Sequence, residues 1–228
     1  MLMIAAAAFG PACAGTPETN EYTEALGLRP DANRGAELFE RCAACHQSSG
    51  HGVPDGSVPA IAGQHFEVVI GQLADMRDDE RHNSRMEPFT GDAELPGAQA
   101  LADVSAHISR LPPNPEPQPG PGAELELGKD LYHGLCSHCH GIGGEGDSEL
   151  QIPRVQGQHY AYLIRQIEAL GTGARHTLDP GTSDLLRDLS RREIEAVADY
   201  MSRLIPLRMP SRPPARAARP QDSAASGR

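Results

Sequence analysis

Residues 42–46 read Cys-Ala-Ala-Cys-His, and residues 136–140 read Cys-Ser-His-Cys-His, 94 positions further along the chain. Shorter matches share this offset and comprise Pro59 with Pro153, Gly63-Gln64-His65 with Gly157-Gln158-His159, and Arg81-His82 with Arg175-His176. Outer matches at an offset of 93, which single-residue insertions explain, are Gly35 with Gly128, Phe39 with Tyr132, and Ser109-Arg110-Leu111 with Ser202-Arg203-Leu204. Similarity at a fixed period indicates a repeated structural unit. We therefore predict that the chain is a tandem duplication.

The 228 residues suffice for two small domains, and a proline-rich segment indicates where they divide. Residues 112–122 hold six prolines in eleven positions. Proline interrupts helices and sheets, and proline-rich linkers behave as semi-rigid extended spacers. We therefore predict a linker over residues 112–122, between domains at residues 31–111 and 123–206.

The sequence pattern within each unit is helical, and no strand pattern competes with it. A short helix is expected before each cysteine motif, at residues 34–41 and 127–134. Second helices are expected at residues 64–77 and 158–169, and a third helix closes each unit. In the second unit, Ser190 and Glu193 have the spacing of a capping box at the start of this third helix. The predicted fold class is all-α, with two tandem domains that each surround one prosthetic group.

Both ends of the chain lie outside these domains. Residues 1–14 combine an apolar run with a final Ala-Cys-Ala sequence, which is typical of a secretory signal peptide cleaved after Ala14. The alternative is a lipid anchor on Cys13. Residues 15–30 form an N-terminal arm, and residues 207–228, with five arginines and four prolines, form a predicted disordered tail. We therefore expect a periplasmic protein, with peripheral membrane association as an alternative to free diffusion.

Composition narrows the classes of partner. Lys and Arg total 20 against 31 Asp and Glu, so the formal net charge is −11. Nucleic-acid binding relies on clustered cations, so this balance argues against nucleic acid and favours a basic docking partner. No stretch of about 18 apolar residues exists, so no membrane-spanning helix is expected. Aromatic residues make up only 4% of the chain, with no Trp, so side chains alone would leave two thin cores.

Four chemistries use a Cys-x-x-Cys-His motif or part of it. A structural disulfide leaves the histidine unexplained, and a thioredoxin-like redox pair requires a βαβ unit, which the pattern lacks. One shared zinc site does not explain why a whole domain repeats around each motif. In covalent haem attachment, the two sulfurs bond the porphyrin and the adjacent histidine binds the iron. We therefore predict two haem c groups, attached through Cys42, Cys45, Cys136 and Cys139, with His46 and His140 as the proximal ligands.

Each half resembles a class I cytochrome c domain, and the pair is similar to dihaem cytochromes of the cytochrome c4 type, over about residues 31–206. The resemblance implies that a first helix carrying Gly and an aromatic residue crosses a last helix carrying another aromatic. The matching positions are Gly35, Phe39, Gly128, Tyr132 and Tyr200, whereas His107 replaces the last aromatic in the first half. It also implies that the carbonyl of Pro59 or Pro153 holds the ring of the proximal histidine.

The sixth iron ligand in such domains is usually a methionine from the loop before the last helix. The first half has Met86 in this loop, whereas Met76 falls within the second helix and is assigned to the core. A His/Met pair raises the reduction potential of a haem. We therefore predict Met86 as the sixth ligand of the first iron. For Arg81 and Arg175 the alternatives are contact with haem propionates, contact with acidic groups at the domain interface, and a solvated side chain.

The second half lacks a matching methionine. Pro180 corresponds to Met86, and the first methionine after the motif of this half is Met201, in the last helix. The alternatives for the second iron are His176, a water-bound or open position, and Met201 or Met209. The remaining histidines are expected in loop or packing roles: His51, His65, His107, His133, His138 and His159.

Two covalent haems on one chain favour an electron carrier over an enzyme. We predict that single electrons pass between a respiratory donor, such as a membrane respiratory complex, and a terminal oxidase or reductase. The alternative is a haem enzyme or enzyme subunit, with an open iron in the second half that acts on a small inorganic substrate. Peroxide, sulfur oxyanions and nitrogen oxides are substrates of this class. No acid/base pair near His176 supports the alternative.

Overall fold

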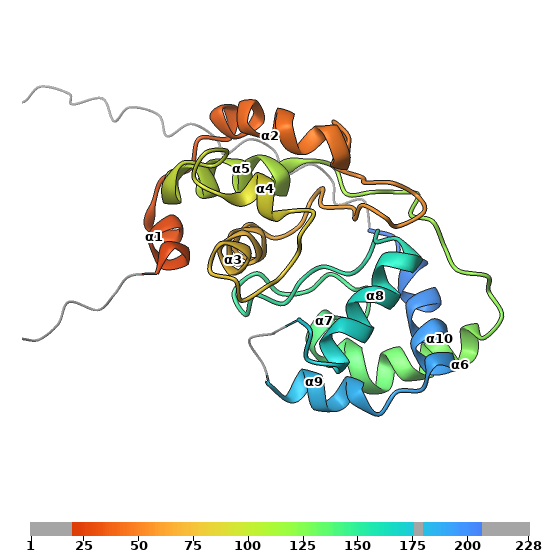
Figure 1. The fold of residues 1–228 in the computed structure, drawn as a ribbon. Helices are drawn as coiled ribbons and strands as arrows, with labels where there is room; N and C mark the ends of the chain where they lie inside the picture. Colours follow the sequence, from red (N-terminus) through yellow and green to blue (C-terminus); the bar gives the residue numbers. More distant parts are fainter. Residues whose placement is uncertain (1–19, 176–179, 207–228) are drawn as a thin grey trace, which may run out of the picture.

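The computed structural model describes residues 20–175 and 180–206, which form two helical halves joined by the proline-rich segment. The halves lie side by side, and the joining segment runs around the outside of the molecule (Figure 1). The described residues contain helices and no strand, which confirms the predicted all-α class. No helix among them is both long enough and apolar enough to cross a membrane. Parts of the sequence-based predictions fall outside the described residues: the signal peptide at 1–14 with Cys13, His176, Met209 and the tail at 207–228.

The first half is built from short helices around one apolar core. They are α1 (Glu21–Gly27), α2 (Ala32–His46), α3 (Phe66–Arg77), α4 (Glu87–Thr90) and α5 (Gly97–Arg110). α2 packs across α5, α3 packs beside α5, and α1 contacts both α3 and α5 (Figure 1). The sequence analysis predicted no helix where α1 lies. Ala25 of α1 is fully buried in the core, so this part of the arm belongs to the first half.

The second half repeats this plan. Its elements are α6 (Leu125–Leu131), the π-helical turn η1 (Tyr132–Cys136), α7 (Ser137–His140), α8 (Tyr160–Gly171), α9 (Pro180–Arg187) and α10 (Arg191–Ser202). α6 packs across α10, and α8 packs against both α9 and α10. The side chain of Ser190 accepts from the Glu193 N–H, and the Glu193 carboxylate accepts from the Ser190 N–H at 2.8 Å. The predicted capping box is therefore confirmed.

A glycine sets the helix crossing in each half. A Cβ placed on Gly35 would lie 1.9 Å from the carbonyl oxygen of Asp103 in α5. A Cβ on Gly128 would lie 2.1 Å from the carbonyl oxygen of Ala196 in α10. Both distances are far shorter than van der Waals contact, so the helices approach this closely because neither position carries a side chain.

Ring pairs lie beside these glycines. The rings of Phe39 and His107 pack with centroids 5.0 Å apart, and those of Tyr132 and Tyr200 pack at 5.4 Å. The first pair joins α2 to α5, and the second joins η1 to α10. The crossing that the family resemblance implies is therefore present in both halves, with His107 in the place of the second aromatic in the first.

The helix bounds differ from the predicted ones around the cysteine motifs. The helix predicted at 34–41 continues to His46, and the one predicted at 127–134 continues through η1 and α7 to His140. The motifs are helical themselves, because no Gly or Pro lies within them to interrupt the helix. α3 and α8 begin two residues later than predicted, because the N-cap residues His65 and His159 have extended backbone conformations.

The proline-rich segment is attached to both halves along its length. His51 Nε2 in the first half lies 3.0 Å from the carbonyl oxygen of Pro112. In the second half, the Gln118 N–H donates to His159 Nδ1 at 3.1 Å. Asn114, between these contacts, is only 5% exposed. The predicted spacer therefore helps to hold the two halves in one arrangement.

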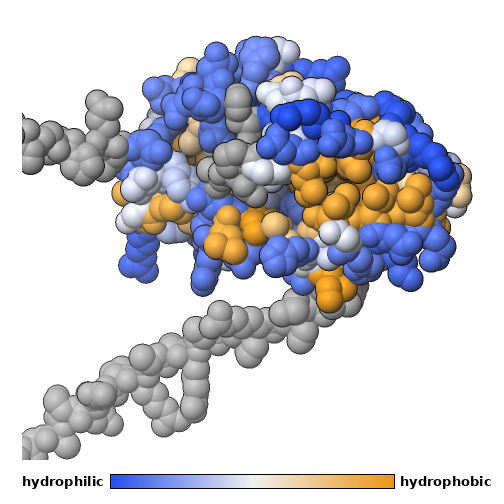
Figure 2. Space-filling model, turned by 90° about the horizontal axis from the view of Figure 1, so that it is seen from below, coloured by the Kyte–Doolittle hydropathy of each residue, from blue (hydrophilic) through white to orange (hydrophobic). Residues whose placement is uncertain are grey.

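The two halves present different surfaces. The underside of the molecule carries a broad hydrophobic patch on the side of the second half (Figure 2). Ile142 is 74% exposed and Leu150 is 68% exposed, and both follow the second cysteine motif. The positions 94 residues earlier hold Ser48 and Gly56. Exposed aliphatic side chains near the motif are thus a feature of the second half.

Candidate functional site

The first cysteine motif lies at the end of α2. Cys42 and Cys45 are three residues apart in this helix and therefore share one face. Cys42 is half-buried, Cys45 is exposed, and neither forms a disulfide. Burial raises the pKa of the Cys42 thiol. This disfavours the thiolate that zinc binding or disulfide exchange requires.

The second motif is placed by the π-helical turn η1. Tyr132 opens this turn fully buried, and its hydroxyl donates to the Gly141 carbonyl, directly after the motif, at 2.6 Å. Burial raises the pKa of Tyr132 far above its ordinary value, so the hydroxyl stays a donor. Burial, and then the nearby Cys139, raises the pKa of the Cys136 thiol to about 11. Such π-helical turns are frequent at functional sites.

The motif histidines are held by one ring nitrogen. His46 Nδ1 lies 3.0 Å from the carbonyl oxygen of Pro59, and His140 Nδ1 lies 2.9 Å from that of Pro153. A carbonyl oxygen only accepts, so Nδ1 carries the proton and Nε2 keeps its lone pair for a metal. Burial lowers the pKa of both imidazoles, which favours the neutral ligand form. With two thiols beside each histidine, the donor set fits a covalent haem in each half.

A tight loop brings each proline carbonyl to its histidine. The Gly52 N–H donates to the His46 carbonyl at 3.0 Å, and the Gly146 N–H donates to the His140 carbonyl at 2.8 Å. Both glycines have left-handed φ values, 71° and 68°. A Cβ on either would lie 2.4 Å from a backbone carbonyl oxygen. Only glycine therefore fits where the chain turns back toward the histidine ring.

Met86 lies in a turn directly before α4. Its N–H donates to the Asn83 carbonyl at 2.8 Å, and the Glu87 N–H donates to the same oxygen at 3.0 Å. The side chain of Asn83 accepts from the Arg85 N–H at 3.2 Å. Met86 is half-buried, whereas Met76 on α3 is buried, as predicted for a core residue. The turn therefore presents Met86 from a defined backbone conformation.

The second half differs at this position. α9 begins at Pro180, in the place that Met86 takes in the first half. Met201 is 4% exposed and packs in the core of the second half. His176 and Met209 lie outside the described residues. Within the described part of the second half, no methionine takes the place of Met86.

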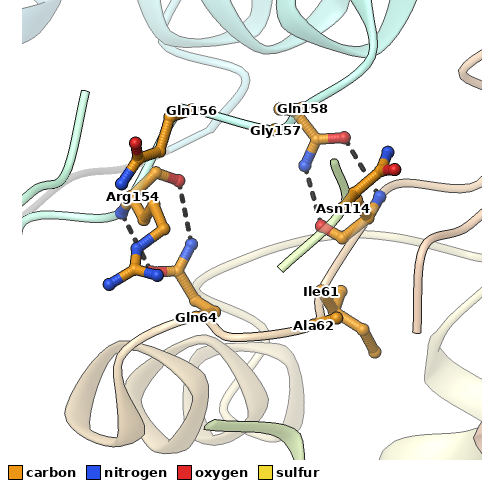
Figure 3. A pocket seen from close by; sticks show the side chains of 9 residues that line it. Ile61, Ala62, Gln64, Asn114, Arg154, Gln156, Gly157 and Gln158 are labelled. Atoms are coloured by element: carbon orange, nitrogen blue, oxygen red, sulfur yellow. Dashed lines mark hydrogen bonds between the residues drawn. The ribbon is translucent and has the colours of Figure 1, made fainter. Parts of the chain in front are cut away.

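Two glutamines from the repeat join the halves. The Gln64 side chain accepts from the Arg154 N–H at 2.9 Å and donates to the Arg154 carbonyl at 3.0 Å (Figure 3). Gln158 makes the same two bonds with the backbone of Ala60, at 3.0 and 2.8 Å. Both pairs of positions are 94 residues apart, so the contact has pseudo-two-fold symmetry. The pocket between them measures about 10 Å³, which is room for one water and not for a substrate.

Two histidines extend this symmetric contact. His65 Nε2 lies 2.8 Å from the Glu145 carbonyl oxygen, and His159 Nε2 lies 2.8 Å from that of His51. The partners are again 94 residues apart. His159 is only 2% exposed, and its Nδ1 also accepts from the Gln118 N–H of the linker. These histidines, predicted as loop or packing residues, are therefore interface residues.

Acidification should weaken the contact between the halves through His159. Burial lowers its pKa below the ordinary 6.5, although the His51 carbonyl and Asp55 favour the charged form. Below pH 6.5 the unfolded chain binds this proton more readily than the folded one, so stability falls as the pH falls. Protonation would also place a hydrogen on Nδ1 against the Gln118 N–H.

Thermal unfolding of the haem-loaded protein, followed between about pH 7.5 and about pH 5, measures this effect. H159Q should lose part of the pH dependence, and H138Q, which changes an exposed histidine, is the matched control. Identical pH dependence in H159Q and the unmodified protein would contradict the expectation.

Arg81 and Arg175 meet at the same interface. Arg81 is 7% exposed and donates to the Gln72 side chain at 2.8 Å and to the Tyr162 hydroxyl of the other half at 3.2 Å. Arg175 donates to Gln166, which is the repeat equivalent of Gln72. Burial, and then the charge of Arg81, lowers the pKa of Arg175 to about 10. Two cations therefore lie close together at this interface, Arg81 buried and Arg175 partly exposed.

One acidic residue lies close to these cations. Burial raises the pKa of Asp75, and the charges of Arg81 and Arg175 oppose that shift. Position 169, its repeat equivalent, is alanine. Asp75 therefore interacts electrostatically with both arginines, whose assignment to haem propionates or to interface acids stays a prediction.

The interface roles of Gln64 and Gln158 were not predicted from the sequence. The Gly-Gln-His match at 63–65 and 157–159 was visible as part of the repeat. Glutamine has no catalytic or metal-binding role in this motif, so its presence in both copies could have indicated a symmetric contact between the halves. Arg77, described below, left no such signal, because its repeat equivalent is Gly171.

Comparisons with known proteins agree with this architecture. The family model described as cytochrome c matches residues 32–112 and 125–204. Cytochrome c4 of Azotobacter vinelandii is 28% identical over 192 residues, covering 76% of this chain and 89% of the relative. Cytochrome c4 of Thiocapsa roseopersicina is 33% identical over 178 residues, covering 72% and 86%. The crystal structure of reduced recombinant cytochrome c4 from Pseudomonas stutzeri superposes with a TM-score of 0.67 at 25% identity, covering 76% of this chain and 98% of that chain.

Two further similarities involve thiosulfate oxidation. The thiosulfate dehydrogenase electron acceptor of Thiomonas intermedia (strain K12) is 35% identical over 83 residues, covering 36% of this chain and 37% of the relative. The structure of a thiosulfate dehydrogenase from Marichromatium purpuratum has a TM-score of 0.67 at 27% identity. That similarity covers 86% of this chain and 44% of the longer protein.

Proposed function

Because the chain belongs to the cytochrome c family, as a dihaem electron-transfer cytochrome with two covalently attached haem c groups, we propose that it carries single electrons between periplasmic redox proteins. Each bound haem supplies a one-electron change of its iron. The observation that carries the proposal is the duplication of one complete site, thiols, histidine and proline carbonyl, in two halves that are fixed to each other. A rigid pair of sites suits transfer from one haem to the next.

The attachment residues are Cys42, Cys45, Cys136 and Cys139, with His46 and His140 on the iron and Pro59 and Pro153 behind the histidines. In this arrangement the proline carbonyls fix the orientation and tautomer of each ring. Such contacts also tune the basicity of the ligand and therefore the haem potential.

Removal of one thiol pair should remove one haem. In the variant C136S/C139S, the second half lacks both thioether bonds, so we expect the haem-to-protein ratio to fall from two to one. H138A, which changes an exposed residue inside the same motif, should retain both haems. A haem assay under denaturing conditions, together with the intact mass, measures the ratio. Two covalent haems in C136S/C139S would show that these cysteines are not the attachment points.

The two irons differ in their sixth ligand. Met86 is the sixth ligand of the first iron, and the turn held by Asn83 positions it. For the second iron, the alternatives are His176, an open or water-bound position and Met209, whereas Met201 is packed in the core. The thioether favours ferrous iron, so a haem bound with Met86 would have the higher potential and would accept electrons from the other one.

The donor that fits best is an enzyme that oxidises thiosulfate. The similarity to a thiosulfate dehydrogenase electron acceptor and to a thiosulfate dehydrogenase structure supports this choice. A terminal oxidase or reductase then accepts the electrons, and a basic surface on the partner would complement the chain's net charge of −11.

One mixing experiment separates the carrier from the enzyme. The oxidised protein, mixed with thiosulfate alone, should stay oxidised, and addition of a thiosulfate dehydrogenase should reduce both haems. Reduction by thiosulfate alone, with turnover in the presence of an electron acceptor, would assign the second iron to catalysis. Failure of reduction in both mixtures, with rapid reduction by another respiratory donor, would keep the carrier and reject the thiosulfate route.

In this proposal the protein functions in the periplasm. The predicted signal peptide at residues 1–14 supports export, with lipid attachment at Cys13 as the alternative. Fractionation of cells and the N-terminal sequence of the purified protein test both. A mature terminus at residue 15 supports cleavage after Ala14, and an acylated cysteine supports the anchor.

A further inference from the structure

Arg77, the last residue of α3, makes an unusual number of contacts for one side chain. It is 9% exposed and forms an ion pair with Glu21 of α1. Its Nε donates to the Thr90 carbonyl at 2.5 Å, and Nη2 donates to the Leu95 carbonyl. Asp92, which is largely exposed, lies 3.4 Å away. One guanidinium group therefore joins three separate segments of the first half.

Two of these contacts fall on the segment that follows Met86. Thr90 ends α4, four residues after Met86, and Leu95 lies just before α5. Both residues are buried, at 2% and 3% exposure. Their carbonyl groups have left the regular helical pattern, so the guanidinium satisfies acceptors that would otherwise lie unpaired at the edge of the core.

Glu21 holds the guanidinium from the opposite side. It opens α1, whose N-cap Asn20 accepts from the Thr23 N–H at 3.0 Å. α1 lies before the first region matched by the cytochrome c family model, which begins at residue 32. The ion pair is largely shielded from water, so it is worth more than an exposed pair and costly to break on one side only. The N-terminal helix thus connects through Arg77 to the segment after Met86.

The second half lacks this arrangement. The repeat equivalent of Arg77 is Gly171, the last residue of α8. A Cβ on Gly171 would lie 3.0 Å from the carbonyl oxygen of Leu186, so α9 packs directly against the end of α8. The arginine clamp is present in the half that carries Met86 and is replaced by close packing in the half that does not.

We infer that Arg77, held by Glu21, is a positioning residue that keeps Met86 on the first iron, an inference that rests on Met86 being the ligand as proposed above. The clamp restrains the segment 87–95, whose movement would carry Met86 away from the site. Loss of the clamp raises the fraction of molecules in which the methionine has left, and an external ligand then binds that fraction.

Carbon monoxide binding to the reduced holoprotein provides the test. In R77Q we expect the apparent affinity of the first haem for carbon monoxide to rise at least tenfold. The near-infrared charge-transfer band of a methionine-ligated ferric haem should weaken in the same variant. R77K should lie between R77Q and the unmodified protein in both carbon monoxide affinity and band intensity. An ammonium group keeps the charge but lacks the planar fork that reaches two carbonyls and a carboxylate. E21Q, which leaves the two carbonyl contacts in place, should show a smaller change in the same direction and serves where R77Q does not fold.

R192Q is the matched control, because it removes an arginine that makes two 2.9 Å bonds to Glu124 on the exposed surface of the second half. It should leave both signals unchanged. M86A distinguishes the assignment of Met86 as ligand from the positioning role of Arg77. Loss of the band in M86A, together with unchanged signals in R77Q and E21Q, would overturn the positioning role alone. An unchanged band in M86A would overturn the ligand assignment and the clamp with it.

Discussion

Replacement of Met86 by alanine should lower the reduction potential of the first haem by on the order of 0.2 V, because axial ligands move haem potentials across about 0.8 V. The thioether stabilises ferrous iron, and water or an open position in its place does so less well. The reduced variant should also bind carbon monoxide at the first haem. The second haem should keep its potential, since no described contact joins Met86 to the second half.

M76L is the control for this variant. Met76 is also a methionine of the first half, but it is buried within α3. Its replacement by an isosteric side chain should leave the potential of the first haem unchanged, and redox titration of both variants measures the difference. An M86A protein with an unchanged potential and an intact charge-transfer band would show that another side chain binds the first iron.

Replacement of Gly35 by alanine should lower the free energy of unfolding by about 3 kcal/mol, the upper end of the usual cost of overpacking. The added methyl group would lie 1.9 Å from the Asp103 carbonyl oxygen, which belongs to backbone and cannot rotate away. The helices α2 and α5 must then move apart, and the core between them loses contact. G128A should have a similar effect on the second half, where the Ala196 carbonyl lies 2.1 Å from the added atom.

G91A controls for the loss of a glycine as such. No atom lies within 4 Å of a Cβ at Gly91, and its φ of −68° suits any residue. Denaturant titration of the holoproteins compares the three variants. If G35A and G91A unfolded at the same denaturant concentration, the close crossing of α2 and α5 would not be a determinant of stability.

The architecture was predictable because the repeat, the proline-rich segment and the capping residues can each be recognised directly in the sequence. Ser190 and Glu193 form the expected capping box, and the glycine and aromatic positions of the first and last helices meet as the resemblance implies. The short helices α1, α4 and α9 were not predicted. α1 has seven residues and α4 has four, lengths at which helices depend on tertiary packing rather than on their own sequence.

The part of the site formed by neighbouring residues in the sequence was predictable. Thiols and histidine lie within five positions, and the proline carbonyl follows at a fixed distance in the repeat. The contacts made by Gln64, Gln158 and Arg77 were not predictable, because most of their partners are backbone N–H and carbonyl groups, which nearly every residue carries. Sequence alone shows no preference for a partner of that kind, so the folded chain was needed to find it.

A potentiometric titration of the unmodified holoprotein, followed by haem absorbance, tests most directly whether two copies of one scaffold hold two unlike irons. We expect two separate one-electron steps. The step with the higher midpoint potential belongs to the haem beside Met86, and in M86A this step should move to a lower potential. A single step in which both haems share one midpoint potential would contradict the difference in axial ligation.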